Sequence, residues 1–252
     1  MGMFIPEDKF YDETKRQTGF NRYKQLLGRH FGDWFKLNAL TILGLLPLAA
    51  GIGLAIASSS ILVLIPCSLL GGMIFGPFLS GMYDSLFRAM RDDPMPMWQN
   101  YQKSWKQNFL GSLVPGALLG LMVGFFCFMG MMLWWARTAP SLGTILLLLF
   151  SALLTMVISQ LYWSQLVLFQ QSPVIRLRNI LLFCIQNFGR VMGVGLLQLA
   201  YWGIYILFAP WTLLILPIVG IWYILFLSQF LLYDRLNNAF GIEEQFRQAE
   251  ES

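Results

Sequence analysis

Four long stretches of this 252-residue chain contain no charged residue at all. Asp, Glu, Lys and Arg together make up only 12% of the chain, and 57% of its residues are hydrophobic. A soluble domain of ordinary composition carries about 25% charged residues. The composition therefore excludes an ordinary soluble domain and indicates an integral membrane protein. The uncharged stretches are Leu37–Tyr83, Gln107–Ala136, Thr138–Ile175 and Val191–Tyr233.

These uncharged stretches predict six transmembrane helices, because a helix needs about 20 apolar residues to cross the hydrocarbon. The first and last stretches are long enough for two helices each, and the middle two for one each. Turns are expected at Ser58-Ser59-Ser60, between Arg137 and Ser141, and at Ala209-Pro210, where proline breaks a helix. The predicted spans are 37–57, 61–83, 109–135, 142–168, 190–208 and 211–233. We expect one all-α membrane domain over 1–252, built as three hairpins at 37–83, 109–168 and 190–233.

The basic residues predict the orientation of these spans. Sixteen of the 17 Lys and Arg residues lie in or next to four segments, and only Arg137 lies on the other side. Because cytoplasmic loops carry an excess of Lys and Arg, we expect these segments and both termini on the cytoplasmic side of a bacterial cytoplasmic membrane. A signal peptide is not expected, since the first 36 residues are polar and charged. The four segments are 1–36, 84–108, 169–189 and 234–252.

The chain is also poor in residues that carry chemistry. The predicted spans have no ionisable residue in their interiors, and the single histidine, His30, has no second ligand at metal-binding spacing. Cys67, Cys127 and Cys184 are expected to be free thiols. We therefore expect no catalytic residue, no metal, no cofactor and no enzymatic activity. Membrane orientation and anionic headgroups explain the basic residues better than nucleic acid does.

An internal repeat is predicted by an ungapped alignment of residues 79–109 with residues 158–188. Tyr83 then faces Tyr162, and Gln107-Asn108-Phe109 faces Gln186-Asn187-Phe188. The repeated unit is an amphipathic helix at the headgroup level followed by a membrane hairpin. These helices are either simple connectors or a cytoplasmic collar around the bundle. Their apolar stripes are Phe20, Tyr23, Leu27, Phe31 and Trp34; Trp98, Tyr101, Trp105 and Phe109; and Leu177, Leu181, Cys184 and Phe188.

Glycines at four-residue spacing predict close packing of helix backbones. Gly72 and Gly76 lie in the second predicted span, and Gly116, Gly120 and Gly124 lie in the third. We expect these glycines to pack the chain against itself, and a seam between two copies of a homo-oligomer is the alternative.

Two groups of residues are candidate sites. Polar residues in the last three predicted spans either bond the helices together or form a cytoplasm-facing pocket for a neutral polar ligand. They are Gln160, Gln198, Gln229, Ser159, Ser228 and Tyr162. A candidate partner surface lies in and before the second amphipathic segment, and it consists of Trp98, Tyr101, Trp105, Arg88 and Arg91. The neighbouring Asp92-Asp93 pair is expected to form an exposed turn rather than a metal site.

Residues 35–112 resemble the YesL-like family of small bacterial integral membrane proteins. The resemblance rests on Phe35-Lys36-Leu37-Asn38, on the run from Gly76 to Tyr83, on Arg91-Asp92-Asp93 and on the segment from Trp105 to Phe109. It implies a non-enzymatic accessory or scaffold protein beside carbohydrate ABC transporter subunits, and it implies no catalytic residue. The alternative is a transporter or channel for a small neutral polar solute, which repeats and proline-containing spans also fit.

Overall fold

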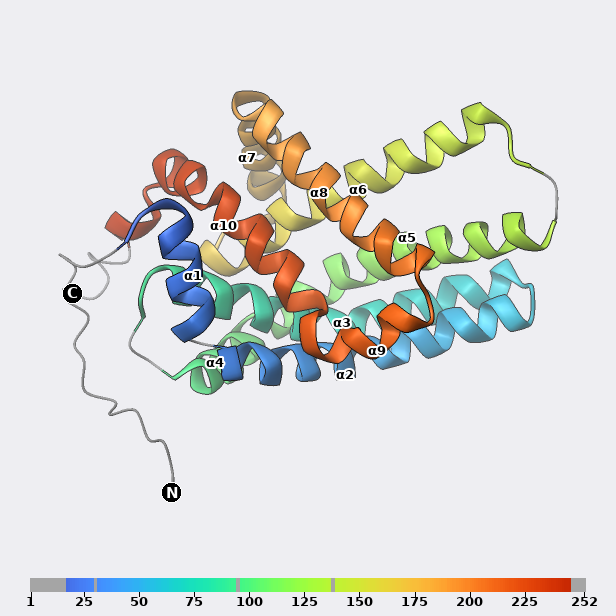
Figure 1. Ribbon diagram of the computed structural model, residues 1–252, viewed down its shortest axis with the longest axis horizontal. Helices are drawn as coiled ribbons and strands as arrows, with labels where there is room; N and C mark the ends of the chain where they lie inside the picture. The colour runs from blue at the N-terminus through green and yellow to red at the C-terminus, as the bar shows by residue number, and fades with distance from the viewer. Residues whose placement is uncertain (1–16, 30, 94–95, 137–138, 246–252) are drawn as a thin grey trace, which may run out of the picture.

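The computed structural model describes residues 17–29, 31–93, 96–136 and 139–245, and every regular element in them is an α-helix. Figure 1 shows long helices running side by side, with short helices gathered at one end. His30 and Arg137 lie outside the described residues. The elements are α1 (Gly19–Arg29), α2 (Phe31–Ala57), α3 (Ile61–Met90), α4 (Met97–Gln107), α5 (Phe109–Trp135), α6 (Leu142–Leu168), α7 (Pro173–Gln186), α8 (Phe188–Leu207), α9 (Trp211–Val219) and α10 (Ile221–Phe240).

Five helices, α2, α3, α5, α6 and α8, are long and apolar enough to cross a membrane. The pair α9 and α10 adds a sixth span if it is counted as one, although the two helices meet at a bend of 58°. The chain is therefore a multi-pass membrane protein, as its uncharged stretches predict. The arrangement as three hairpins and the internal repeat stay predictions.

The sixth span is not the single helix predicted over 211–233. Pro217 lies inside α9, and it has no N–H to bond the preceding turn of the helix. Gly220 separates α9 from α10 with φ −86° and ψ −118°, which is outside the helical region. The chain then continues as α10 to Phe240, beyond the predicted end of the span. By contrast, Pro47, Pro66, Pro77 and Pro115 all lie within continuous helices.

Three of the short helices, α1, α4 and α7, lie at one end of the bundle, and we call them the collar (Figure 1). Their predicted stripes need two corrections. The stripes run across helix ends, so Phe31 and Trp34 belong to α2, Phe109 to α5 and Phe188 to α8. In α7 the predicted stripe is largely on the outside, and the face packed against the protein carries Arg176, Ile180 and Phe183 instead.

Helix α3 is central, since it contacts α2, α4, α5, α6 and α10. Its glycines face those of α5, and a Cβ added at Gly72 would lie 2.9 Å from the Cα of Gly120. A Cβ added at Gly116 would lie 2.8 Å from the Cα of Gly76. The predicted close packing within the chain is therefore confirmed, because the two backbones touch where side chains are missing.

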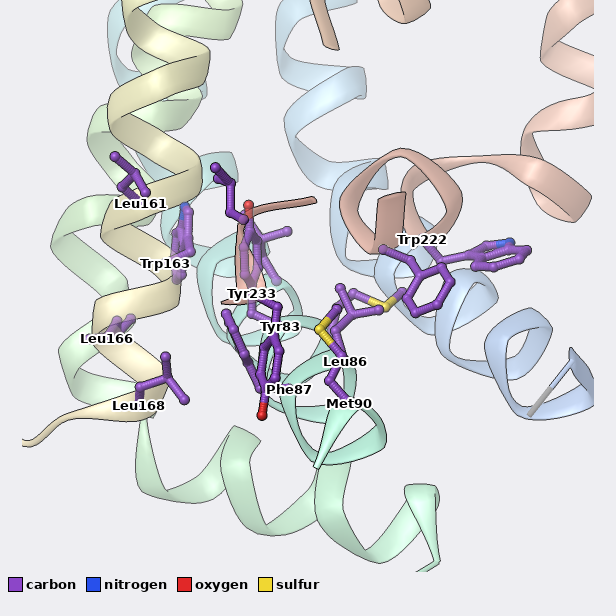
Figure 2. Close-up of a cluster of buried hydrophobic side chains, with 14 of the residues drawn as sticks. Tyr83, Leu86, Phe87, Met90, Leu161, Trp163, Leu166, Leu168, Trp222 and Tyr233 are labelled. Atoms are coloured by element: carbon purple, nitrogen blue, oxygen red, sulfur yellow. The ribbon is translucent and has the colours of Figure 1, made fainter. Parts of the chain in front are cut away.

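The buried apolar core lies between α3, α6 and α10, near the collar. Figure 2 shows its side chains from α3 directed toward those of α6 and α10. Tyr83 stacks on Trp163 with ring centroids 6.4 Å apart, and the ring centroids of Phe87 and Tyr233 are also 6.4 Å apart. These large rings fix the C-terminal helices against α3 and so position the polar groups described next. The three cysteines are free thiols, as predicted.

Candidate functional site

Buried polar side chains of α6, α8 and α10 meet inside the bundle. Gln198 of α8 donates from Nε2 to Gln160 Oε1 of α6 (2.8 Å) and to Ser228 Oγ of α10 (2.9 Å). The Ser164 hydroxyl of α6 lies 2.9 Å from Gln229 Oε1 of α10, and this hydrogen bond joins α6 directly to α10. All five side chains are at least 95% buried. We call Gln160, Ser164, Gln198, Ser228 and Gln229 the glutamine cluster.

The glutamine cluster brings together four of the six residues predicted for a polar pocket. It is tightly closed, and none of its members lines either of the two best-formed hollows in the described part of the chain. The Nε2 amino groups of Gln160 and Gln229 are buried with no acceptor among the described residues. The contacts are those expected of hydrogen bonds that join helices, and the pocket stays a prediction.

Ser159 and Tyr162 lie elsewhere. Both line an apolar groove between α5 and α6, on the other side of the helix from the cluster. Neighbouring residues of an α-helix point about 100° apart, which lets Gln160 face α8 while Ser159 lines the groove. The Tyr162 hydroxyl accepts a hydrogen bond from Arg176 Nη1 of α7 (3.1 Å).

We expect replacement of Gln198 by leucine to destabilise the protein by about 1 kcal/mol, the usual size of a hydrogen bond between membrane helices. The change removes the donor to Gln160 and to Ser228 together. Thermal unfolding in detergent, followed by tryptophan fluorescence, measures the effect. The exposed Gln102 of α4 gives the control, since Gln102→Leu should leave the melting temperature in place. Equal melting temperatures for the Gln198→Leu and Gln102→Leu variants would contradict the prediction.

The break between α9 and α10 is held by a side chain from the other half of the chain. Asn38 of α2 is fully buried, and its Nδ2 donates to the carbonyls of Leu216 (2.9 Å) and Pro217 (2.8 Å). Its Oδ1 accepts from the backbone N–H of Trp222 (3.3 Å). One amide side chain thus satisfies backbone groups on both sides of the break, as burial in a membrane requires.

Two tyrosines of α8 complete these bonds. The Tyr205 hydroxyl donates to the carbonyl of Val219 (2.8 Å), and the Tyr201 hydroxyl lies within hydrogen-bond distance of Val219 and, at 3.0 Å, of Gly220. The break is therefore a defined structure with satisfied backbone groups, and not a frayed helix end. Asn38, Tyr201 and Tyr205 were not predicted to act together, because no sequence spacing relates α2 to α9.

Charged side chains tie α1 to the end of α3. Arg22 and Arg29 of α1 both pair with Asp92, and Arg29 Nη1 lies 2.9 Å from it. Arg88 pairs with Asp84 (2.7 Å) and Asp93 (2.8 Å). Burial lowers the pKa of the Arg91 guanidinium, which lies among these groups.

The turn of Asp92 and Asp93 is therefore half-buried, and the prediction of an exposed turn is wrong. The pairing partners on α1 lie about 70 residues away, so local sequence gave no signal for them.

The predicted partner surface is divided by the structure. Trp98 is 50% exposed, whereas Tyr101 is buried and Trp105 is half-buried against Phe78. The side chain of Arg88 is only 16% exposed, because it pairs within the charged group. Of the five predicted residues, Trp98 is thus the one that offers a large free surface at the collar.

Comparison with known proteins gives a match for one part of the chain, residues 34–131. No curated protein and no solved structure matches the chain. A family described as proteins of unknown function, DUF624, matches residues 34–131, which run from the first turns of α2 nearly to the end of α5. That region holds the packed glycines, Asn38 and Trp98. Over residues 34–131, the chain is similar to the DUF624 family.

Proposed function

We propose that the protein is a non-enzymatic accessory or scaffold protein of a bacterial cytoplasmic membrane, and that its collar binds subunits of a carbohydrate ABC transporter. The observation that carries the proposal is the location of the polar and the apolar side chains in the protein. The side chains of the glutamine cluster bond to one another inside the bundle, while the collar leaves large apolar side chains exposed. Those of α7 are Val174, Ile175, Leu177, Leu181, Leu182 and Ile185.

The position of the basic residues supports a collar on the cytoplasmic side. Lys103 and Lys106 of α4 and Arg178 of α7 are exposed at this end of the bundle. The resemblance to YesL-like proteins is what directs the proposal to carbohydrate ABC transporters, because those proteins are expected to work beside them.

Local structure supports the internal repeat as part of this proposal. A single asparagine joins a collar helix to the next long helix in both units, Asn108 between α4 and α5 and Asn187 between α7 and α8. Both asparagine N–H groups donate to a carbonyl four residues earlier at 2.9 Å. We infer that the collar consists of repeated parts, each one leading into membrane helices.

Affinity purification of the tagged chain in mild detergent tests the proposal, with recovery of transporter subunits in equal amounts as the expected result. Trp98→Ala should lower that recovery about tenfold, because exposed tryptophans often dominate an interface. Trp135 is the matched control, since it is 48% exposed against 50% for Trp98 and lies at the far end of α5. An equal loss with Trp135→Ala, or no transporter subunit at all, would contradict the proposal.

A transporter or channel for a small neutral polar solute is the second candidate, and the α9–α10 break favours it. Discontinuous membrane helices often form substrate sites in transporters, and this break lies beside polar groups of α2 and α8. Purified protein reconstituted alone into liposomes decides between the two candidates. Uptake of a labelled neutral sugar would support the transporter, and intact reconstitution without uptake would remove it.

A further inference from the structure

A groove of about 550 Å³ runs along the outside of the bundle between α5 and α6. Pro173 and Leu177 of α7 line it at the collar end. This volume is in the range of sites for small organic ligands. The walls are formed by Val114, Pro115, Leu118, Leu119 and Met122 of α5 and by Ser151, Leu154, Thr155, Ile158, Ser159, Tyr162 and Trp163 of α6.

The walls of the groove are apolar and open to the bilayer. Leu118, Leu154 and Ile158 are exposed to 57%, 37% and 46%, and all three lie on membrane-spanning helices. The hydroxyls of Ser151 and Thr155 are engaged by backbone carbonyls of their own helix. A flexible hydrocarbon chain therefore suits the groove better than a polar solute does.

A positive charge lies next to the collar end of the groove. Arg176 of α7 is 95% buried, and its guanidinium carbon lies 5.0 Å from the centre of the Tyr162 ring, which lines the groove. Its Nη1 donates to the Tyr162 hydroxyl (3.1 Å), and its Nη2 donates to the carbonyl of Gln171 (3.1 Å). Its Nε is buried with no acceptor among the residues that the structure describes.

These acceptors are neutral, so none of them compensates the charge. The chain has no Asp or Glu anywhere from Pro94 to Tyr233, although Lys103, Lys106, Arg176, Arg178 and Arg190 lie in that stretch. Arg176 has no ion pair with a described residue, and a buried cation without a counterion is costly, so an anionic partner would offset the cost. An anionic group at the end of a hydrocarbon chain would match both the groove and the charge.

We propose that the groove between α5 and α6 is a binding site for one anionic phospholipid. An acyl chain lies along the apolar walls, and the phosphate lies at the collar end, where Arg176 supplies the positive charge. The inference does not depend on the scaffold role, because it needs no protein partner. It assigns Arg176 of α7 to lipid recognition at the collar end of the groove.

Native mass spectrometry of the full chain tests the proposal, in detergent micelles doped with equal amounts of phosphatidylglycerol and phosphatidylcholine. The wild-type chain should retain one phosphatidylglycerol about tenfold more than phosphatidylcholine, the size of one charge-assisted hydrogen bond. Arg176→Gln should abolish this preference. Arg178→Gln removes an exposed charge on the other side of the same helix, so it should leave the preference in place.

A second variant keeps the test decisive if Arg176→Gln does not fold. Leu118→Trp fills the groove and leaves Arg176 in place, so it should lower phosphatidylglycerol retention about as much. Leu196→Trp is its control, since Leu196 is 53% exposed on α8 and outside the groove. Equal retention of both lipids by the wild-type chain would overturn the proposal, because it indicates ordinary boundary lipid. An unchanged preference in the Leu118→Trp variant would overturn it too.

Discussion

Leucine in place of Gly72 is expected to prevent the chain from folding into a stable monodisperse protein. A Cβ added at Gly72 would overlap the carbonyl oxygen of Gly116 and would lie 2.9 Å from the Cα of Gly120. Both are backbone atoms, which cannot rotate away as a side chain can. Overpacking a core usually costs about 1–3 kcal/mol, and here α3 and α5 would have to separate along their whole contact. Size-exclusion chromatography of the detergent-solubilised variant measures the loss of the folded peak.

Gly130→Leu is the matched control on α5. An added Cβ at Gly130 meets no atom within 4 Å, and the residue is exposed. That variant should elute as the wild type does. Normal elution of the Gly72→Leu variant would show that the α3–α5 contact is wrongly placed.

Alanine in place of Asn38 should cause the second large effect, a loss of about 3 kcal/mol or more, because each buried polar group left without a partner costs about 1–3 kcal/mol. The change leaves the carbonyls of Leu216 and Pro217 and the N–H of Trp222 without their partner. Thermal unfolding in detergent should show a lower melting temperature.

Asn187→Ala provides the comparison for this variant. Its Nδ2 makes one weak hydrogen bond of 3.3 Å to the carbonyl of Phe183 in its own helix, so its loss should lower stability far less. A smaller effect for Asn38→Ala than for Asn187→Ala would mean that the α9–α10 break is held by other groups.

Local properties of the sequence predicted most of the membrane helices. Uncharged runs of about 20 or more residues located α2, α3, α5, α6 and α8, because desolvation alone decides which segments can enter the hydrocarbon. The glycine spacing likewise predicted the contact of α3 with α5, since missing side chains let backbones approach.

Long-range contacts were beyond the same reasoning. Asn38 bonds to residues about 180 positions away, and Arg22 pairs with Asp92 about 70 positions away. The sequence correctly placed Gln160, Gln198 and Gln229 in one group of polar residues on the last three spans. It could not show which face of its helix each polar residue occupies. Ser159 and Tyr162 therefore lie in the groove and not with the glutamines.

The turn between α8 and α9 has a consequence for the thickness of the surrounding bilayer. Figure 1 shows this turn stopping short of the far end that α2, α3, α5 and α6 reach. Helix α8 has 20 residues and α6 has 27, which correspond to about 30 Å and 40 Å of helix. The side chains of Leu207, Phe208 and Trp211 at this turn are apolar and exposed, so the turn is suited to contact with hydrocarbon. Its N–H groups at Phe208, Ala209, Thr212 and Leu213 all have backbone partners within the chain. The flank of the protein at α8 thus matches a thinner hydrocarbon layer than the flank formed by the longer helices. The surrounding bilayer must therefore be locally thinner beside α8.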